Sequence, residues 1–359
     1  MKRILTYTLL AATVLSSCMK LSELNTKSAL TLEFDIEELN TKATVAGDNT
    51  LNENKIDELD VFFYKNGESD AKIYKHFSLS GENSLNIHLS TADLTKLGYT
   101  TGNATTFGLF VIANRPDGVS VTGIETIAAL KDKNITATKA FNEIQDNFVM
   151  TGEAIASGGS GTNGFTASVN LKRTASKFGL SITATTDYNG EIDNINSTWS
   201  PVPSAATVKF FGSTTSGKLG GAPTRNAQVD YETEHSIPAV YYSYPSNPLP
   251  ENQPYYVIML PWNNGAVTKN TYYKVICDYE QFSANTFYQL SVDITRVGSS
   301  KEPEAVRLSP EALNFSTAPW GKNIVSGNEE FQTQAVIKDA RYLVTYSDSY
   351  TGIKMKCTI

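Results

Sequence analysis

Cysteine and histidine are scarce in this chain of 359 residues. The three cysteines and three histidines are Cys18, Cys277, Cys357, His76, His88 and His235. No CxxC or HExxH motif occurs, so a zinc site or a histidine-based catalytic triad would have few residues to draw on. We therefore predict no metal site, no cofactor and no catalytic residues, and we expect that the chain is not an enzyme. Cys277 and Cys357 are expected to be unpaired thiols, although they are the one pair that could form a disulfide once Cys18 is acylated.

Clusters of positive charge and long apolar runs are also lacking. The chain carries 30 Lys and Arg against 37 Asp and Glu, a net charge of −7. An acidic chain without a basic run is a poor partner for nucleic acid or for electrostatic docking on anionic lipid. The apolar stretch at residues 4–14 is too short to span a bilayer.

A secretory signal opens the chain. Lys2 and Arg3 precede the apolar residues 4–14, and Leu15-Ser16-Ser17-Cys18 follows with the pattern of a lipobox. Lipoprotein processing requires a small residue at the cleavage site and a thiol just after it, because the thiol takes a diacylglycerol and Cys18 becomes the acylated first residue. The alternative is an ordinary cleaved signal with an incidental cysteine. We predict a lipoprotein that is anchored in the outer membrane by its acyl chains and exposed at the cell surface.

Short alternating stretches separated by Gly, Pro and Asn run through the rest of the chain. Residues 31–36 and 56–64 alternate apolar and polar side chains, and residues 107–113 form a continuous apolar run. Only short helices are expected, such as one turn at 93–97 capped by Thr91. This pattern predicts an all-β fold with two β-sandwich domains in tandem.

The glycine-rich stretch GGSGTNG at residues 158–164 is the most linker-like part of the chain. It lacks a lysine and a following helix, so it does not indicate a phosphate-binding loop. The predicted organisation is a signal peptide at 1–17, a tether and first strand at 18–45, an N-terminal sandwich at 46–160, a C-terminal sandwich at 161–299 and an extension with spare strands at 300–359.

Asp57, Glu58 and Asp60 form the closest group of acids that could act as a catalytic pair. Because Leu59, Val61 and neighbouring apolar residues alternate with them, the acids lie on the outward face of the strand. We interpret them as a solvated face and not as catalytic groups.

Aromatic residues could form a sugar-stacking platform or fill the cores of the sandwiches. The residues in question are Trp199, Trp262, Trp320, Tyr241, Tyr242, Tyr244, Tyr255 and Tyr256. Core and rim packing is the favoured interpretation. The alternative, a monomeric glycan-binding lipoprotein at the cell surface, requires exposed coplanar tryptophans.

Both ends of the folded region carry strands that could be exchanged between subunits. A strand lies before a basic residue at 31–42, and spare strands follow at 306–346. A sandwich that loses its first strand exposes unpaired backbone groups, which an extended segment with alternating apolar residues can complete. The alternative is that both ends only extend their own sheets.

The order of motifs resembles the Bacteroidales-type fimbrillins, the FimA-like and Mfa-like lipoprotein pilins of type V pili. The matching stretches are ENKIDELDVFFYKNGE (53–68), FGLFVIANRP (107–116), FVMTG (148–152), VNLKRTASKFGLSI (169–182), VYYSYPSNP (240–248), TYYKVICDYEQFSANTFYQLSVDITRVGS (271–299) and APWGKN (318–323). Together they cover most of residues 31–325 in the order of the family.

The resemblance implies transthyretin-like sandwiches that polymerise by strand exchange after a protease removes the first strand. The cut would follow Lys42, with Lys27 as the weaker choice. The removed strand would contain Thr31, Leu32, Phe34 and Ile36. The donor residues, supplied by a neighbouring subunit from 306–315 and 324–335, would include Val306, Leu308, Leu313, Phe315, Ile324 and Val325.

The predicted function is therefore that of a structural fimbrial subunit that supports adhesion to a host or bacterial surface. Its partners would be other fimbrial subunits, either copies of itself or tip and anchor subunits. Two departures from the family pattern bear on this. Lysine occupies the cleavage position where arginine is commoner, and about 35 residues follow the Pro319-Trp320 element, as in tip or accessory subunits.

Overall fold

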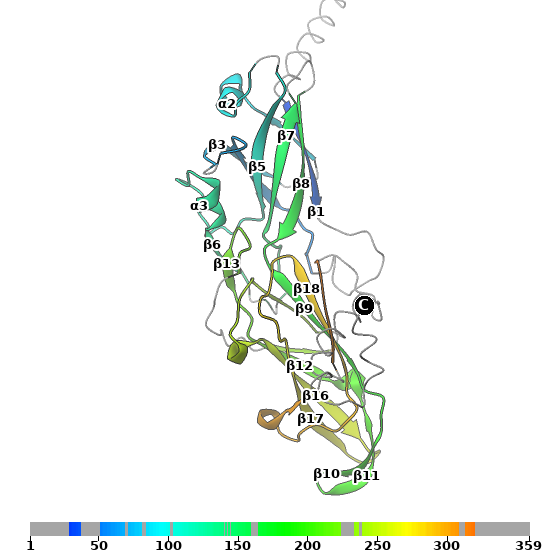
Figure 1. Cartoon of the computed structure of the whole chain (residues 1–359). Coiled ribbons are helices and arrows are strands. Elements are labelled where there is room, and N and C mark those ends of the chain that lie inside the picture. Colours follow the sequence, from blue (N-terminus) through cyan, green and yellow to red (C-terminus); the bar gives the residue numbers. More distant parts are fainter. Residues whose placement is uncertain are drawn as a thin grey trace, which may run out of the picture. The chain divides into compact units, whose positions relative to one another are not determined.

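The computed structural model describes residues 29–36, 51–68, 71–80, 84–100, 103–139, 141, 143, 145–158, 164–223, 233–236, 239–308 and 313–319 (Figure 1). These residues form two compact units. Unit 1 takes its residues from 1–37, 56–133 and 149–172, and unit 2 from 38–55, 134–148 and 173–359. Strands dominate both units, and the described residues contain only two short α-helices, so the all-β prediction is confirmed.

Unit 1 is built on one sheet of seven strands in the order β3-β2-β5-β7-β8-β1-β4. Its elements are β1 (Ala29–Ile36), β2 (Glu58–Tyr64), β3 (Ile73–Ser80), β4 (Ser84–His88), α2 (Thr91–Lys96), β5 (Thr105–Ala113), α3 (Ile127–Lys131), β7 (Met150–Gly158) and β8 (Phe165–Arg173). The glycine-rich stretch 158–164 connects β7 to β8, two neighbours in this sheet. Unit 2 resumes at Arg173, whereas the sequence predicted a boundary at 160/161.

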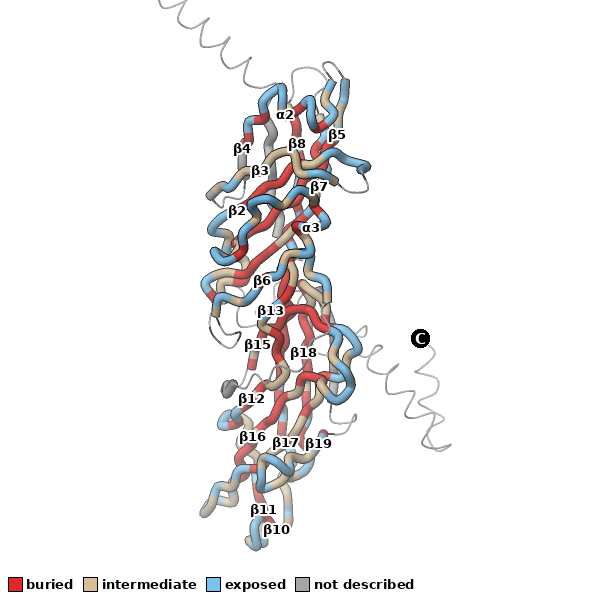
Figure 2. Tube along the Cα trace, turned by 90° about the vertical axis from the view of Figure 1, so that its left-hand side faces the viewer, coloured by how far each residue is buried: buried red, intermediate tan, exposed pale blue. Residues whose placement is uncertain are grey.

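The core of unit 1 lies on one face of this sheet, and the alternation of the strands explains it. Leu59, Val61 and Phe63 of β2 are buried with Phe107 and the alternate residues of β5 and β8. The opposite face is covered as well, since Phe62 is buried and Lys131 of α3 lies over the ring of Phe110. Figure 2 shows buried stretches along β2, β5 and β8.

Unit 2 contains two larger sheets and a small one. One sheet has the order β10-β11-β16-β12-β14, with β17 beside β16 and β19 beside β17; a second has the order β15-β9-β18-β20; β6 and β13 form the third. The elements are β6 (Asn134–Thr136), β9 (Ser176–Thr183), β10 (Tyr188–Ile192), β11 (Ile195–Pro201), η1 (Pro203–Ala205), β12 (Thr207–Phe211), β13 (Ser216–Lys218), β14 (Thr233–Ser236), β15 (Ala239–Ser243), η2 (Pro250–Asn252), β16 (Tyr255–Asn263), β17 (Thr268–Ile276), β18 (Thr286–Asp293), η3 (Glu302–Glu304), β19 (Val306–Arg307) and β20 (Leu313–Pro319).

Aromatic side chains fill the core of unit 2. Trp199 and Trp262 have no exposed surface, and most of the tyrosines in question, Tyr241, Tyr242, Tyr244 and Tyr256, are also buried. Tyr255 is half-buried and stacks on Phe211 with ring centroids 4.8 Å apart. Core packing is therefore confirmed for all these residues except Tyr255, which lies at the rim, and Trp320, which lies outside the described residues. Cys277 is buried in the same core with an unpaired thiol.

Candidate functional site

Strand β1 is held on both edges by backbone pairing within unit 1. It runs parallel to β8 in the register Leu30↔Phe165 to Ile36↔Leu171, and antiparallel to β4 in the register Ala29↔His88 to Glu33↔Ser84. Figure 1 shows β1 beside β8. The predicted strand at 31–36 is therefore confirmed as a strand, extended by two residues at its start, and it occupies a slot between β8 and β4.

The slot is lined by apolar residues at every second position. In β8, the buried residues Phe165, Ala167, Val169 and Leu171 alternate with exposed ones. Leu32, Phe34 and Ile36 of β1 stand opposite Ala167, Val169 and Leu171 in the register. Residues paired across neighbouring strands share a face of the sheet, so the register places these three positions on the face of the buried residues of β8. Thr31, the fourth residue predicted for the removable strand, stands opposite the exposed Thr166.

The chain order makes β1 separable from the rest of unit 1. The described residues between β1 and β2 that precede residue 56, namely 51–55, belong to unit 2, and the chain re-enters unit 1 at residue 56. The strands β2, β3, β4, β5, β7 and β8 of unit 1 all follow β1 in the chain, so none of them is connected to another through β1. A cut between β1 and β2 would release β1 and leave these connections unbroken.

The C-terminal strands lie at edges of the unit 2 sheets. In β19, Val306 stands opposite Tyr273 of β17, and Leu308 just beyond it is buried in the core of unit 2. Leu313 and Phe315 belong to β20, which pairs antiparallel with β18 and is the outermost described strand of its sheet. In this structure Val306, Leu313 and Phe315 thus extend the sheets of their own unit, and Leu308 packs in its core.

Several predicted site residues lie outside the described residues. These are Cys18, Lys27, Lys42, Ile324 and Val325. Within the described part of the chain, no helix is long and apolar enough to cross a bilayer. No group of three or more metal-ligating side chains was found in that part of the chain either.

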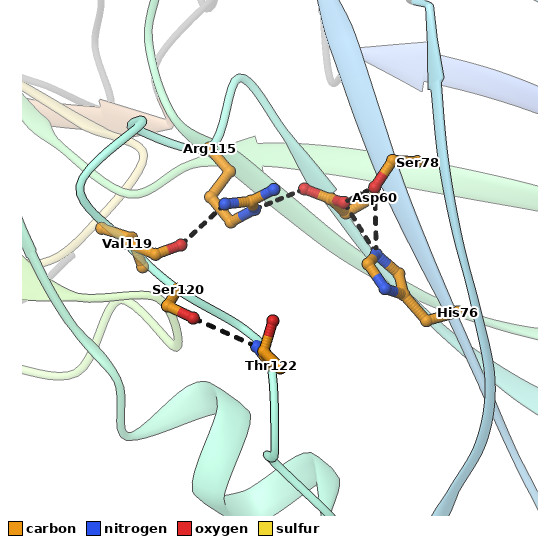
Figure 3. A network of polar contacts seen from close by, with 7 residues as sticks. All are labelled: Asp60, His76, Ser78, Arg115, Val119, Ser120 and Thr122. Carbon is orange, nitrogen blue, oxygen red and sulfur yellow. Dashed lines mark hydrogen bonds and ion pairs between the residues drawn. The ribbon is translucent and has the colours of Figure 1, made fainter.

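Of the three acids interpreted as a solvated face, Asp57 and Glu58 are exposed, as expected, but Asp60 is not. Its side chain does lie on the other face of the strand from Leu59 and Val61, but it is only 2 % exposed. Its carboxylate accepts hydrogen bonds from Ser78 Oγ at 2.6 Å and Arg115 Nε at 2.6 Å, and it lies 2.7 Å from His76 Nε2 (Figure 3). Arg115 also donates to the carbonyl of Val119 at 2.7 Å. The loop that follows β5 therefore covers this face, which the local alternation of β2 could not indicate.

The network around Asp60 holds its carboxylate in the ionised form. Burial raises the pKa of Asp60, but hydrogen bonds from His76, Arg115 and Ser78, together with the charge of Arg115, outweigh burial and hold this pKa well below its usual range. The carboxylate is therefore ionised at neutral pH, where it ties β2 to β3 and to the loop after β5.

The lowered pKa of Asp60 predicts acid sensitivity of unit 1. The unfolded state binds a proton first, so this stabilisation is complete above the unfolded pKa of about 4 and is lost as the pH falls below it. We expect the free energy of unfolding to fall by up to about 1.4 kcal/mol per pH unit from this group. Calorimetric unfolding between pH 5 and 2 should show a shallower loss in Asp60→Asn than in wild type. The exposed Asp117→Asn is the control, and an unchanged acid slope in Asp60→Asn would contradict the prediction.

A second buried charge, which no sequence pattern indicated, fixes the segment after β1 in unit 2. The carboxylate of Glu53 lies 2.9 Å from Lys177 Nζ and accepts a hydrogen bond from Tyr242 Oη at 2.6 Å. The side chains of Glu53 and Lys177 are only 1 % and 2 % exposed. Arg173 Nε donates to the backbone carbonyl of Glu53 at 2.8 Å. Residues downstream of the predicted cleavage position therefore have an anchor of their own, independent of β1.

The sequence also matches a known protein family over this region. Residues 28–203, from the start of β1 into unit 2, match the family described as major fimbrial subunit protein (FimA). This part of the chain belongs to the fimbrillin-like family. The protein is accordingly a subunit of a fimbrial or adhesive structure at the cell surface, and it interacts with other fimbrial subunits. No curated protein sequence matches the fimbrillin-like chain.

Solved structures share the fold of this fimbrillin-like chain at low sequence identity. A fimbrilin (FimA) from Porphyromonas gingivalis is 15 % identical, with a TM-score of 0.54 over 82 % of this chain and 98 % of the other. A proposed cell adhesion protein from Bacteroides eggerthii is 13 % identical, with a TM-score of 0.53 over 81 % and 94 %. Another, from Parabacteroides distasonis, is 12 % identical, with a TM-score of 0.50 over 83 % and 99 %.

Proposed function

We propose that this protein is a structural fimbrial subunit that polymerises by donor-strand exchange. It is exported as a lipoprotein acylated at Cys18 and anchored in the outer membrane. A protease cuts after Lys42 and releases β1, and an extended segment from the C-terminal region of a neighbouring subunit fills the slot. The assembled fimbria supports adhesion. Membership in a family of structural subunits also favours the expectation that the protein is not an enzyme.

The observation that carries this proposal is the position of β1 between β8 and β4. A strand with partners on both edges leaves two rows of unpaired backbone groups when it departs, and an extended peptide satisfies both at once. The buried residues of β8 add pockets for alternate apolar side chains. Each such side chain contributes roughly 1.5–3 kcal/mol on burial, before the cost of ordering the donor. Several together would make the junction dissociate slowly.

The burial of the two tryptophans that the structure describes argues against the alternative of a glycan-binding lipoprotein. Stacking on sugar rings needs exposed aromatic faces, and Trp199 and Trp262 have none. The fimbrial role leaves a choice between stalk, tip and anchor subunits. Processing at Lys42 distinguishes an anchor or a monomeric lipoprotein from a processed subunit, because an anchor keeps its lipid and an unprocessed first strand.

The proposal predicts a new N-terminus and a polymer that resists detergent. Protein sheared from cells should begin at Ala43, by N-terminal sequencing and intact mass, and should run as an SDS-resistant ladder. Lys42→Ala should abolish both. Lys27→Ala is a matched control, because both lysines end the same pentapeptide Glu-Leu-Asn-Thr-Lys, at 23–27 and 38–42. A wild-type protein that begins at acylated Cys18 and shows no ladder would refute processing and polymerisation by this route.

A further inference from the structure

Strand β4 depends on β1 for its place in the sheet. Among the described strands, the only ladder partner of β4 is β1, with five paired positions from Ala29↔His88 to Glu33↔Ser84. Strand β8, on the other side of the slot, also belongs to the sheet through β7. The two walls of the slot therefore differ, because β8 keeps its other ladder partner when β1 departs and β4 keeps none among the described strands.

The elements on either side of β4 have supports that do not involve β1. Strand β3 pairs along its length with β2, from Glu58↔Ser80 to Tyr64↔Ile73. Helix α2 is capped by Ser90, which exchanges hydrogen bonds with Asp93, and Lys75 of β3 lies 3.5 Å from Asp93.

Buried leucines hold the same region in the core. Leu89, the residue after β4, and Leu94 of α2 are 1 % and 2 % exposed. Strand β4 thus lies between two anchored elements, while all five of its own residues pair with β1.

We propose that β4 is a movable wall of the slot that is held in the sheet by whichever strand the slot contains. This inference rests on the proposed function and describes how the slot takes its partner. When β1 leaves, β4 detaches from the sheet while β3 and α2 stay in place. The incoming segment of a second copy then pairs with the exposed edge of β8, and β4 closes antiparallel on its other edge.

A movable β4 sets the requirements that an entering strand must meet, and it makes entry into the slot easier. An entering strand meets one fixed edge, so it does not have to thread between two fixed strands. It must run parallel to β8 and carry apolar residues at alternate positions. It must also be free of proline where it pairs, because both of its backbone edges are used. The closure of β4 adds five paired positions after entry, which slows dissociation of the occupant more than it slows its arrival.

Hydrogen exchange of the purified full chain tests this. Leu30→Asp with Leu32→Asp places charges opposite Phe165 and Ala167 and should expel β1 from the slot. We expect amides at 84–88 to exchange at least about tenfold faster, while those of β5, which lies between β2 and β7, keep their wild-type rates. Thr31→Asp, at the alternate position opposite the exposed Thr166, is the matched control and should leave 84–88 protected.

Addition of a peptide with the sequence of residues 29–36 should restore protection at 84–88 in the double variant. The same peptide with serine at the positions of Leu30 and Leu32 should not. Continued protection of 84–88 at the level of β5, whatever the state of β1, would overturn the proposal. An equal loss of protection at 84–88 and in β5, seen in both the double variant and the milder Leu32→Ser, would also overturn it. Because the measurement uses the unprocessed monomer, its outcome is independent of whether cells cut after Lys42.

Discussion

Replacing Glu53 with alanine should lower the free energy of unfolding of unit 2 by about 3–5 kcal/mol. The substitution removes the carboxylate that lies 2.9 Å from Lys177 Nζ and accepts the hydrogen bond of Tyr242, at a site almost without solvent. The ammonium group of Lys177 would then stay buried without this counter-charge, and its desolvation would no longer be offset. Trp199 and Trp262 are buried in unit 2, and unit 1 contains no tryptophan, so tryptophan fluorescence during urea unfolding reports unit 2.

Two controls separate the buried pair from charge in general. Glu304→Ala breaks an exposed ion pair with Lys301, whose side chain is 67 % exposed, and should change stability by less than about 1 kcal/mol. Glu53→Leu combined with Lys177→Met replaces both charges by apolar groups of similar size and should recover most of the loss. A loss of less than about 1 kcal/mol in Glu53→Ala would mean that the pair does not hold the segment in place.

Local patterns were sufficient to predict the strands and the all-β fold. Alternation marked β1 and β2, and a continuous apolar run marked β5, each to within two residues at either end. These strands could be predicted because one buried face imposes a period of two on the sequence. The short helix near residue 93 could also be predicted, although Ser90, and not Thr91, provides its N-cap.

The features that escaped prediction depend on contacts between distant residues. Asp60 lies on the face opposite the apolar residues, as alternation indicates, but Arg115, 55 positions away, covers and pairs with it. Glu53 lies in the polar segment Asn52-Glu53-Asn54, and this local sequence predicts a solvated side chain. Its partners Lys177 and Tyr242 are 124 and 189 positions away. The same limit applies to the glycine-rich stretch, since composition does not distinguish a connection between β7 and β8 from a linker between domains.

The candidate site was predicted in part. The residues of β1 could be identified as a strand from their alternation, and the resemblance to fimbrillins implied that this strand is removable. Neither source indicated that β1 runs parallel to β8 while β4 closes its other edge, because this arrangement depends on the order of strands in the sheet. The structure thus adds the two walls of the slot to a strand that the sequence could already locate.

Phe34→Asp with Ile36→Asp should destabilise unit 1 of the uncut precursor by about 3–6 kcal/mol, twice the value for one buried apolar side chain. In the register these positions stand opposite Val169 and Leu171, which have no exposed surface. A carboxylate at either position would have to lie beside apolar side chains without a counter-charge. Scanning calorimetry of the full chain should show a lower melting temperature for unit 1.

A comparison of melting temperatures before and after cleavage tests whether the effect of the double variant comes from β1 in the slot. Once β1 has been removed, wild type and the double variant are the same molecule from residue 43 onward, so their melting temperatures must coincide. Glu33→Gln with Asp35→Asn is the matched control on the same strand, opposite Ser168 and the exposed Asn170, and should melt like wild type before and after the cut. If the double Asp variant melted like wild type in the uncut chain, β1 would contribute little to the sheet. Its removal would then leave no apolar slot that a neighbouring subunit gains by filling, and strand exchange would lack its driving force.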